Sequence, residues 1–225
     1  MDAAKIRLSK EELALVMDPD WILTKNSIMG KVGMLFGELS GEMQKSFRLQ
    51  ADSLKQPLNE SGLQLAAEGL KLEAGGLPLE LPLNWATPKI SRGENYKGLP
   101  YMVLDYPRAF GREDVLAIRT LFWWGHYFSV TLHLKGRYKT LFLPVIRERI
   151  LLLAAAGFHV NVSEEEWRHE LDLENYLPLQ GNAGTVILKE RSFLKLSAKC
   201  GLDRWDDADS VLLELFRVLV EVLGF

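Results

Sequence analysis

Two strand-like segments separated by a single glycine constrain the fold of this chain more than any other feature. Residues 115–124 (VLAIRTLFWW) and 126–134 (HYFSVTLHL) are rich in β-branched and aromatic side chains, which favour extended structure. The segments meet at Gly125, where the sequence allows either a tight hairpin or a bulge within one bent strand. A short strand at 99–104 precedes them, so we expect an antiparallel meander over residues 99–134.

Helical patterns flank this meander on both sides. Apolar residues recur at helical spacing from residue 28 to 47 and again from 138 to 156, and a final helix begins near Asp206. Further strands are expected near residues 159 and 193. We therefore predict an α+β fold in which a central antiparallel sheet of about four or five strands is covered by N-terminal, middle and C-terminal helices.

The chain is expected to form one domain. At 225 residues it is long enough to bury a substantial core without a metal or a disulfide. We predict a single α+β domain over residues 1–225, in which residues 1–55 are a semi-independent helical part. Residues 52–98 are rich in proline and glycine and show no regular period. Within them, residues 77–83 (LPLELPL) are expected to be extended, with prolines that prevent regular pairing.

Composition excludes several classes of protein. Positive and negative residues nearly balance, at a net charge of −3, whereas nucleic-acid binding requires clustered excess positive charge. The longest uninterrupted apolar run, residues 150–158, is less than half of the ~20 residues that a membrane-spanning helix needs. Cys200 is the single cysteine, which excludes an internal disulfide and a multi-cysteine zinc site. We therefore expect a cytoplasmic protein that binds neither nucleic acid nor membrane.

Two serine-to-glutamate spacings of the capping-box type predict helix starts. Ser9 and Glu12 predict a short N-terminal helix. Ser163 and Glu166 predict a short acidic helix that runs through His169.

Charge is also segregated along the middle of the chain. Residues 135–149 contain five basic residues and one acid, Glu148, whereas residues 164–174 contain six acids. We expect the acidic block to be the internal counterpart of the basic block. The alternative is that the basic block binds phosphate or an acidic partner.

No standard catalytic or cofactor-binding motif occurs in the chain. The sequence lacks a nucleophile elbow, a P-loop, a zinc-protease motif and a dinucleotide-binding glycine pattern. Glu165 and His169 stand one helical turn apart, a spacing that suits a metal, but a solvated acidic face is the commoner reason for such a pair. We therefore predict no cofactor and no metal, and the catalytic residues stay unknown.

The aromatic strand pair is the best candidate for a binding site. Strand alternation puts the even-numbered residues from His126 to Leu134 on one, mainly apolar face and the odd-numbered residues from Tyr127 to His133 on the other. The first face should cover the core, and the polar face should border solvent or a cleft. Aromatic surface with few polar groups is typical of small-molecule sites, although such tryptophans more often fill space, with the histidines satisfied by local hydrogen bonds. The candidate ligand-binding residues are Asp105, Arg119, Trp123, Trp124, His126, Tyr127, Thr131 and His133.

Three functions remain open. The favoured one is a non-catalytic ligand-binding or protein-interaction module that uses residues 119–133, with a small molecule or a protein as its partner. The second is an acid–base or hydrolytic enzyme centred on His126, His133, Asp105 and Arg119. The third is a homo-oligomeric structural protein, because the C-terminal helix is apolar over most of its circumference and must be covered either in the core or in a homodimer.

Overall fold

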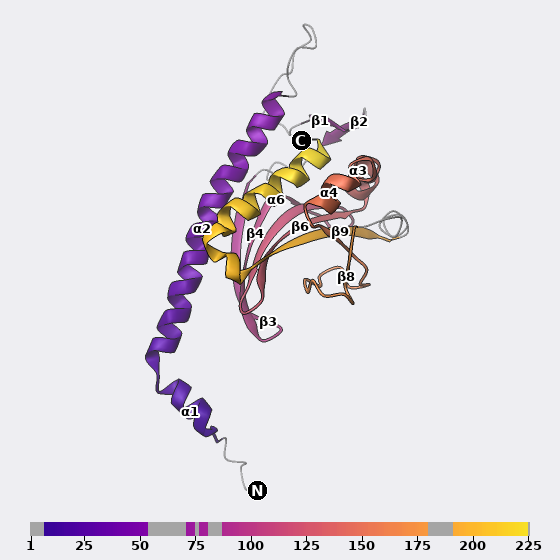
Figure 1. Cartoon of the computed structure of the whole chain (residues 1–225). Coiled ribbons are helices and arrows are strands. Elements are labelled where there is room, and N and C mark those ends of the chain that lie inside the picture. The colour runs from indigo at the N-terminus through magenta and orange to yellow at the C-terminus, as the bar shows by residue number, and fades with distance from the viewer. Residues whose placement is uncertain (1–6, 54–70, 75–76, 81–86, 180–190, 225) are drawn as a thin grey trace.

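A seven-stranded sheet forms the centre of the fold, and helices pack on one of its faces (Figure 1). The computed structural model describes residues 7–53, 71–74, 77–80, 87–179 and 191–224. All neighbouring strands of the sheet are antiparallel, in the order β3-β4-β5-β6-β9-β7-β8, which confirms the α+β class. In chain order the strands are β3 (Lys89–Tyr96), β4 (Leu99–Phe110), β5 (Val115–Trp123), β6 (Tyr127–Lys135), β7 (His159–Asn161), β8 (Tyr176–Pro178) and β9 (Phe193–Gly201).

The sheet is larger than the four or five strands expected. β3 shows no apolar alternation (KISRGENY) because it is an edge strand whose side chains are mostly exposed. β7 and β8 contain three residues each, which is too short for a periodic signal. The expected strands near residues 159 and 193 are present as β7 and β9.

The central meander is confirmed, and Gly125 lies in a hairpin turn. Trp123 pairs with Tyr127, which leaves residues 124–126 as the turn. Gly125 has φ +73°, a left-handed conformation that glycine adopts without strain. β4 extends beyond the expected strand, because a register shift between Asp105 and Arg108 accommodates Pro107, which has no N–H to donate.

The helices cover one face of the sheet. α6 lies between α2 and the α3–α4 pair and contacts both β6 and β9 (Figure 1). The helix expected over residues 138–156 is divided at Arg149. The helices are α1 (Lys10–Val16), α2 (Pro19–Ser53), α3 (Arg137–Glu148), α4 (Ile150–Ala155) and α6 (Ala208–Leu223), with a 3₁₀ helix, η1 (Leu202–Asp207), before α6.

The main core lies between these helices and the sheet. The even-numbered residues of β6 from Phe128 to Leu134 are all fully buried in it, as the alternation predicted. α6 is a core helix, with eight residues from Ala208 to Leu223 buried within the chain itself. α2 joins the core only from Met29 onward. The division of the chain into one domain with a semi-independent N-terminal part stays a prediction.

A separate two-stranded sheet corrects one expectation. β1 (Lys71–Ala74) pairs antiparallel with β2 (Leu77–Glu80), so the first part of the segment 77–83 is regularly paired despite Pro78. A two-stranded ladder tolerates proline because its outer edges need no N–H donors.

Candidate functional site

The face of the sheet opposite the helices carries four of the predicted site residues close together. Directly opposed residues of antiparallel strands share one face, with their Cβ atoms about 5 Å apart. The register therefore places side chains from four strands in two adjacent rows. These rows are Asp105–Arg119–Thr131–Ser197 and Ala117–His133–Lys195.

Residues 162–175, the loop between β7 and β8, cover this face, and we call them the strap (Figure 1). Val162 N donates to the Asn175 carbonyl oxygen (2.7 Å), so the ends of the strap lie together as in an Ω-loop. The strap is irregular, and the acidic helix expected from Ser163 through His169 is therefore wrong. Ser163 Oγ accepts a hydrogen bond from Glu165 N in a turn, while the Glu166 side chain points to the sheet instead of closing a capping box.

One end of the strap is held by side chains of β6 and β9. The Glu166 carboxylate lies 3.1 Å from His133 Nε2 and 2.8 Å from Lys135 Nζ. Lys195 Nζ donates to the carbonyl oxygens of Glu166 (3.0 Å) and Arg168 (2.6 Å). The sheet thus binds both a carboxylate and the backbone of the strap.

The other end is held by two tyrosines. Tyr127 Oη donates to the His169 carbonyl oxygen (3.0 Å) and accepts from Leu171 N (2.8 Å). Tyr96 Oη donates to the Glu170 carboxylate and accepts from His169 N (2.9 Å). These hydroxyl groups replace the backbone partners that an irregular loop lacks.

An ion pair lies between these two ends. Arg119 Nε and Nη2 donate to the two carboxylate oxygens of Asp105 at 2.7 and 2.9 Å, the bidentate geometry that gives strong pairs. Arg119 Nη1 also lies 3.5 Å from His169 Nε2. Because Asp105 is engaged by Arg119, it does not form the histidine–carboxylate pair that the enzyme hypothesis needs.

Burial changes the protonation of the groups beneath the strap. Lys195 is 2% exposed, and burial together with the nearby Arg119 charge lowers its pKa to about 7. Burial and the charge of Lys195 lower the pKa of His133 to about 3, so its imidazole is neutral at pH 7. Burial also lowers the pKa of His169 and raises that of Tyr127 to about 12.

The space between strap and strands is very small. A cavity of about 10 Å³ is lined by Phe110, Ala117, Arg119, Thr131, His133, His169 and Lys195. That volume is sufficient for about one water molecule and not for a small-molecule ligand. Trp167 of the strap closes the site from outside, with its ring centroid 5.2 Å from that of His133.

The remaining predicted residues lie elsewhere. Trp123 is on the same face as Tyr127, and its ring stacks on His126 at a centroid distance of 3.6 Å. His126 is exposed in the hairpin turn, about 20 Å along β6 from His133. Trp124 packs against the core on the helical face, edge to face with Phe122. The structure therefore does not bring the two histidines of the enzyme hypothesis together.

Sequence reasoning missed three members of this cluster. Lys195 is a charged residue between two leucines of a buried strand, which is an unusual environment and a usable signal. The sequence predicts a solvated helix for Glu166 and His169, and only the folded structure reveals that they contact Lys135 and Arg119. These three residues complete the site from β9 and from the strap.

A second surface of a different kind lies at the N-terminus. Residues 8–23, which we call the arm, comprise α1 and the first turns of α2, and extend beyond the sheet (Figure 1). α1 contains no buried residue. The arm nevertheless holds eight of the fifteen large apolar side chains that are exposed in the described part of the chain. They are Leu8, Leu13, Leu15, Val16, Met17, Trp21, Ile22 and Leu23.

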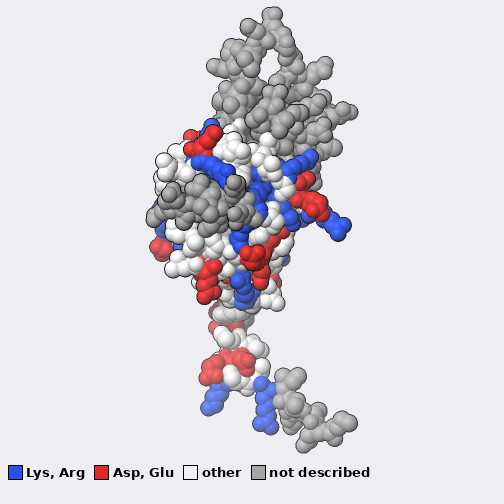
Figure 2. Space-filling view, turned by 90° about the vertical axis from the view of Figure 1, so that its right-hand side faces the viewer, with Lys and Arg blue, Asp and Glu red and all other residues white. Residues whose placement is uncertain are grey.

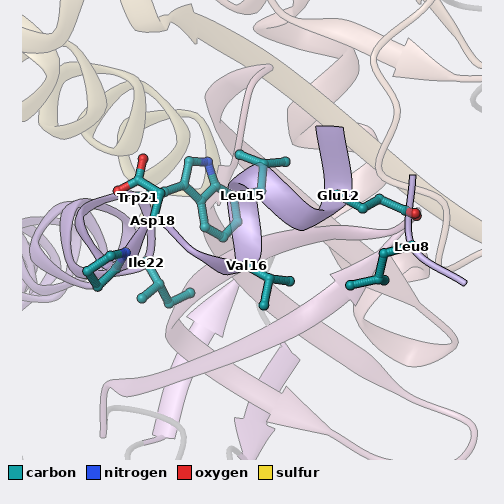
Figure 3. Close-up of a pocket in the computed structure, with 8 residues that line it drawn as sticks. Leu8, Glu12, Leu15, Val16, Asp18, Trp21 and Ile22 are labelled. Carbon is teal, nitrogen blue, oxygen red and sulfur yellow. The ribbon is translucent and has the colours of Figure 1, made fainter. Parts of the chain in front are cut away.

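Five of these side chains, Leu8, Leu15, Val16, Trp21 and Ile22, line an open pocket of about 690 Å³ between α1 and the start of α2 (Figure 3). Trp21 and Ile22 of α2 line it together with Leu15 of α1. The capping box predicted for α1 is confirmed, with Ser9 Oγ accepting from Glu12 N (3.1 Å) and the Glu12 carboxylate accepting from Ser9 N (2.6 Å). α1 is therefore stabilised by local hydrogen bonds, and its apolar side chains stay available.

Comparison of the chain with protein-family models, with curated proteins and with solved structures found no match. Within the described residues, no helix is long and apolar enough to cross a membrane. The same residues include no group of three or more histidine, cysteine or acidic side chains placed to hold a metal ion. The function is therefore inferred from the two surfaces themselves.

Proposed function

We propose that this protein is a non-catalytic protein-interaction module that binds an amphipathic helix of a partner protein in the pocket of the arm. The observation that carries the proposal is the exposure of eight large apolar side chains within residues 8–23. Exposed apolar patches of this kind mark interaction surfaces, because covering them is favourable by about 25 cal/mol per Å². The strand region 119–133, where the sequence indicated binding, is covered by the strap, so the proposal places the binding surface in the arm.

The shape of the pocket supports a helical partner. α1 and α2 meet at Asp18 and Pro19, and both helices contribute apolar side chains to one concave surface (Figure 3). An amphipathic helix binds such a groove with side chains spaced at three and four residues. Trp21, which is 51% exposed, is the natural anchor, because tryptophan dominates the energetics of many interfaces.

The charge of the arm specifies the partner further. The arm contains a single base, Lys10, against four acids, Glu11, Glu12, Asp18 and Asp20. Two of these acids, Glu12 and Asp18, line the pocket itself. Figure 2 shows charged side chains on the arm beside uncharged surface. The partner helix should therefore carry basic residues beside its apolar stripe, and a second acidic arm is a poor match.

A model peptide tests this proposal. The probe is an amphipathic helix of about 18 residues, or five turns, made of leucine and lysine, and its counterpart replaces lysine by glutamate. Fluorescence anisotropy should detect binding of the basic peptide only, and Ile22→Asp should weaken it at least about tenfold, since a buried isoleucine contributes roughly 1.5–3 kcal/mol. Leu151→Asp, at an exposed leucine of α4, is the matched control and should bind as the wild type does. Equal binding by wild type and Ile22→Asp, or no binding by either, would overturn the proposal.

Two other occupants are distinguished by further measurements. If sedimentation equilibrium finds a dimer that Ile22→Asp dissociates, the arm binds a second copy of the chain and the proposal is wrong. If the wild type floats with phosphatidylcholine vesicles and Ile22→Asp does not, the arm binds lipid and the proposal is likewise wrong.

We also propose a cytoplasmic location for this module. The support is the single cysteine, Cys200, which is buried as a free thiol, and cysteine usage of this kind suits a reducing compartment. Assembly through α6 is not part of the proposal, since eight residues of that helix are buried within one chain and its exposed stripe carries Glu214, Arg217 and Glu221.

A further inference from the structure

The strands beneath the strap contain very few acidic residues. β4, β5, β6 and β9 together contain Asp105 as their one acidic residue, against five basic residues. Asp105 is fully engaged by Arg119. The basic residues are Arg108, Arg119, Lys135, Lys195 and Lys199.

The strap supplies the missing negative charge. It contains six acids, one arginine and one histidine. Among these acids, Glu166 is the one that contacts the basic residue Lys135 of β6. Its carboxylate lies between His133 Nε2 (3.1 Å) and Lys135 Nζ (2.8 Å). Glu166 therefore places a carboxylate between an imidazole and an ammonium group of β6.

The fit of Glu166 in this position is incomplete. His133 is 5% exposed and borders the cavity, yet its Nε2 makes no properly directed hydrogen bond with any described residue. The same holds for Glu166 Oε1, although the two atoms are close. Leaving a buried polar atom without a directed partner is unfavourable, so an anion free to orient itself would satisfy His133 better than the tethered side chain does.

The contacts between the strap and the sheet are of a kind that water or a ligand can replace. From Ser163 to Glu174 every residue is at least partly exposed, and hydrogen bonds of Tyr96, Tyr127 and Lys195 hold this segment to the sheet. Such contacts can be replaced by water or by a ligand at much lower cost than buried apolar surface.

We propose that the sheet face beneath the strap is a binding site for a small oxyanion, a carboxylate or a phosphate, and that Glu166 is its internal substitute. The ligand oxygens would accept hydrogen bonds from His133 Nε2 and Lys135 Nζ, with Lys195 Nζ beside them. Its entry displaces the Glu166 end of the strap. This site is independent of the arm, and neither proposal depends on the other.

Removing the internal carboxylate should expose the site. In isothermal titration calorimetry, Glu166→Ala should bind inorganic phosphate or acetate at least about tenfold more tightly than the wild type, because the tethered competitor is gone. Comparison of the two anions identifies the preferred chemistry. Glu174→Ala removes an exposed glutamate of the same strap and should bind like the wild type.

A second variant and a second measurement complete the test. Glu166→Gln keeps the shape of the side chain and should also bind the anion more tightly than the wild type. If circular dichroism shows that Glu166→Ala is unfolded, the anion affinity of Glu166→Gln tests the proposal in its place. Adding Lys135→Met to either variant should abolish the gain. In the wild type, saturating phosphate should accelerate hydrogen exchange at the Arg168 amide, which donates to the Glu165 carbonyl oxygen at 3.3 Å in the turn that contains Glu166. The proposal is overturned if neither Glu166 variant gains affinity, if the gain survives Lys135→Met, or if phosphate leaves that exchange rate unchanged.

Discussion

The buried ammonium group of Lys195 should make the stability of this protein depend on pH in a way that the structure specifies. Burial is the main reason that its pKa falls from 10.5 to about 7 in the folded chain. In the unfolded chain the pKa returns to the ordinary value. Between pH 7 and 10.5 the unfolded state therefore binds more protons than the folded state, so stability rises with pH across this interval. The whole difference amounts to about 5 kcal/mol, of which about half falls between pH 7.5 and 9.5.

Lys195→Met isolates this contribution, because it removes the titrating group and keeps an unbranched stem. Urea unfolding at pH 7.5 and 9.5 should show that the wild type gains about 2–3 kcal/mol more than Lys195→Met over this interval. Lys199→Met, at an exposed lysine of the same strand, is the control and should retain the wild-type pH dependence. Parallel pH profiles for the wild type and Lys195→Met would show that burial does not depress this pKa, and the reasoning would be refuted.

Three further changes test the strap and the arm. Asp105→Asn leaves Arg119 without its bidentate partner and should cost about 3 kcal/mol in urea unfolding, with partial recovery when Arg119→Met is added; a cost without recovery would contradict the pairing. Tyr127→Phe should cost about 1–2 kcal/mol and accelerate hydrogen exchange at Leu171, and an unchanged exchange rate would exclude the hydroxyl contact. Ser9→Ala should weaken α1 by about 1 kcal/mol, lowering helicity by circular dichroism, without moving the urea midpoint; a shifted midpoint would show that α1 contributes to the core.

The two faces of the sheet could be predicted from the sequence because the alternation of apolar and polar residues is a local pattern. The alternation in β6 assigns Phe128 to the core and His133 to the opposite face, and a slip of one residue would reverse every side chain. The turn at 124–126 then fixes the register of β5 on β6. Arg119 and Thr131 are opposite each other because of this hairpin register alone, and no long-range contact is needed to place them together.

The covering of the polar face could not be predicted in the same way. The spacing of Ser163 and Glu166 satisfies a local rule for a helix start, and the structure departs from that rule. Glu166 instead contacts Lys135 and His133, about 30 residues away in sequence, and the strap backbone binds Lys195 on a strand that follows it. The local preference was therefore overridden by partners whose positions depend on the whole sheet.

The two surfaces have opposite chemistry, and this decides which kind of ligand each can take. Beneath the strap the chain balances its own charges, and any one of those polar contacts can be exchanged for a contact with water or an ion. On the arm, neither water nor an ion can substitute for the missing apolar contacts of Trp21 and Ile22, so only another apolar surface stabilises them. A change at Ile22 should therefore leave anion binding intact, and a change at Glu166 should leave peptide binding intact. If either substitution altered both activities, the arm and the strap would be coupled, and the two sites would have to be interpreted as one.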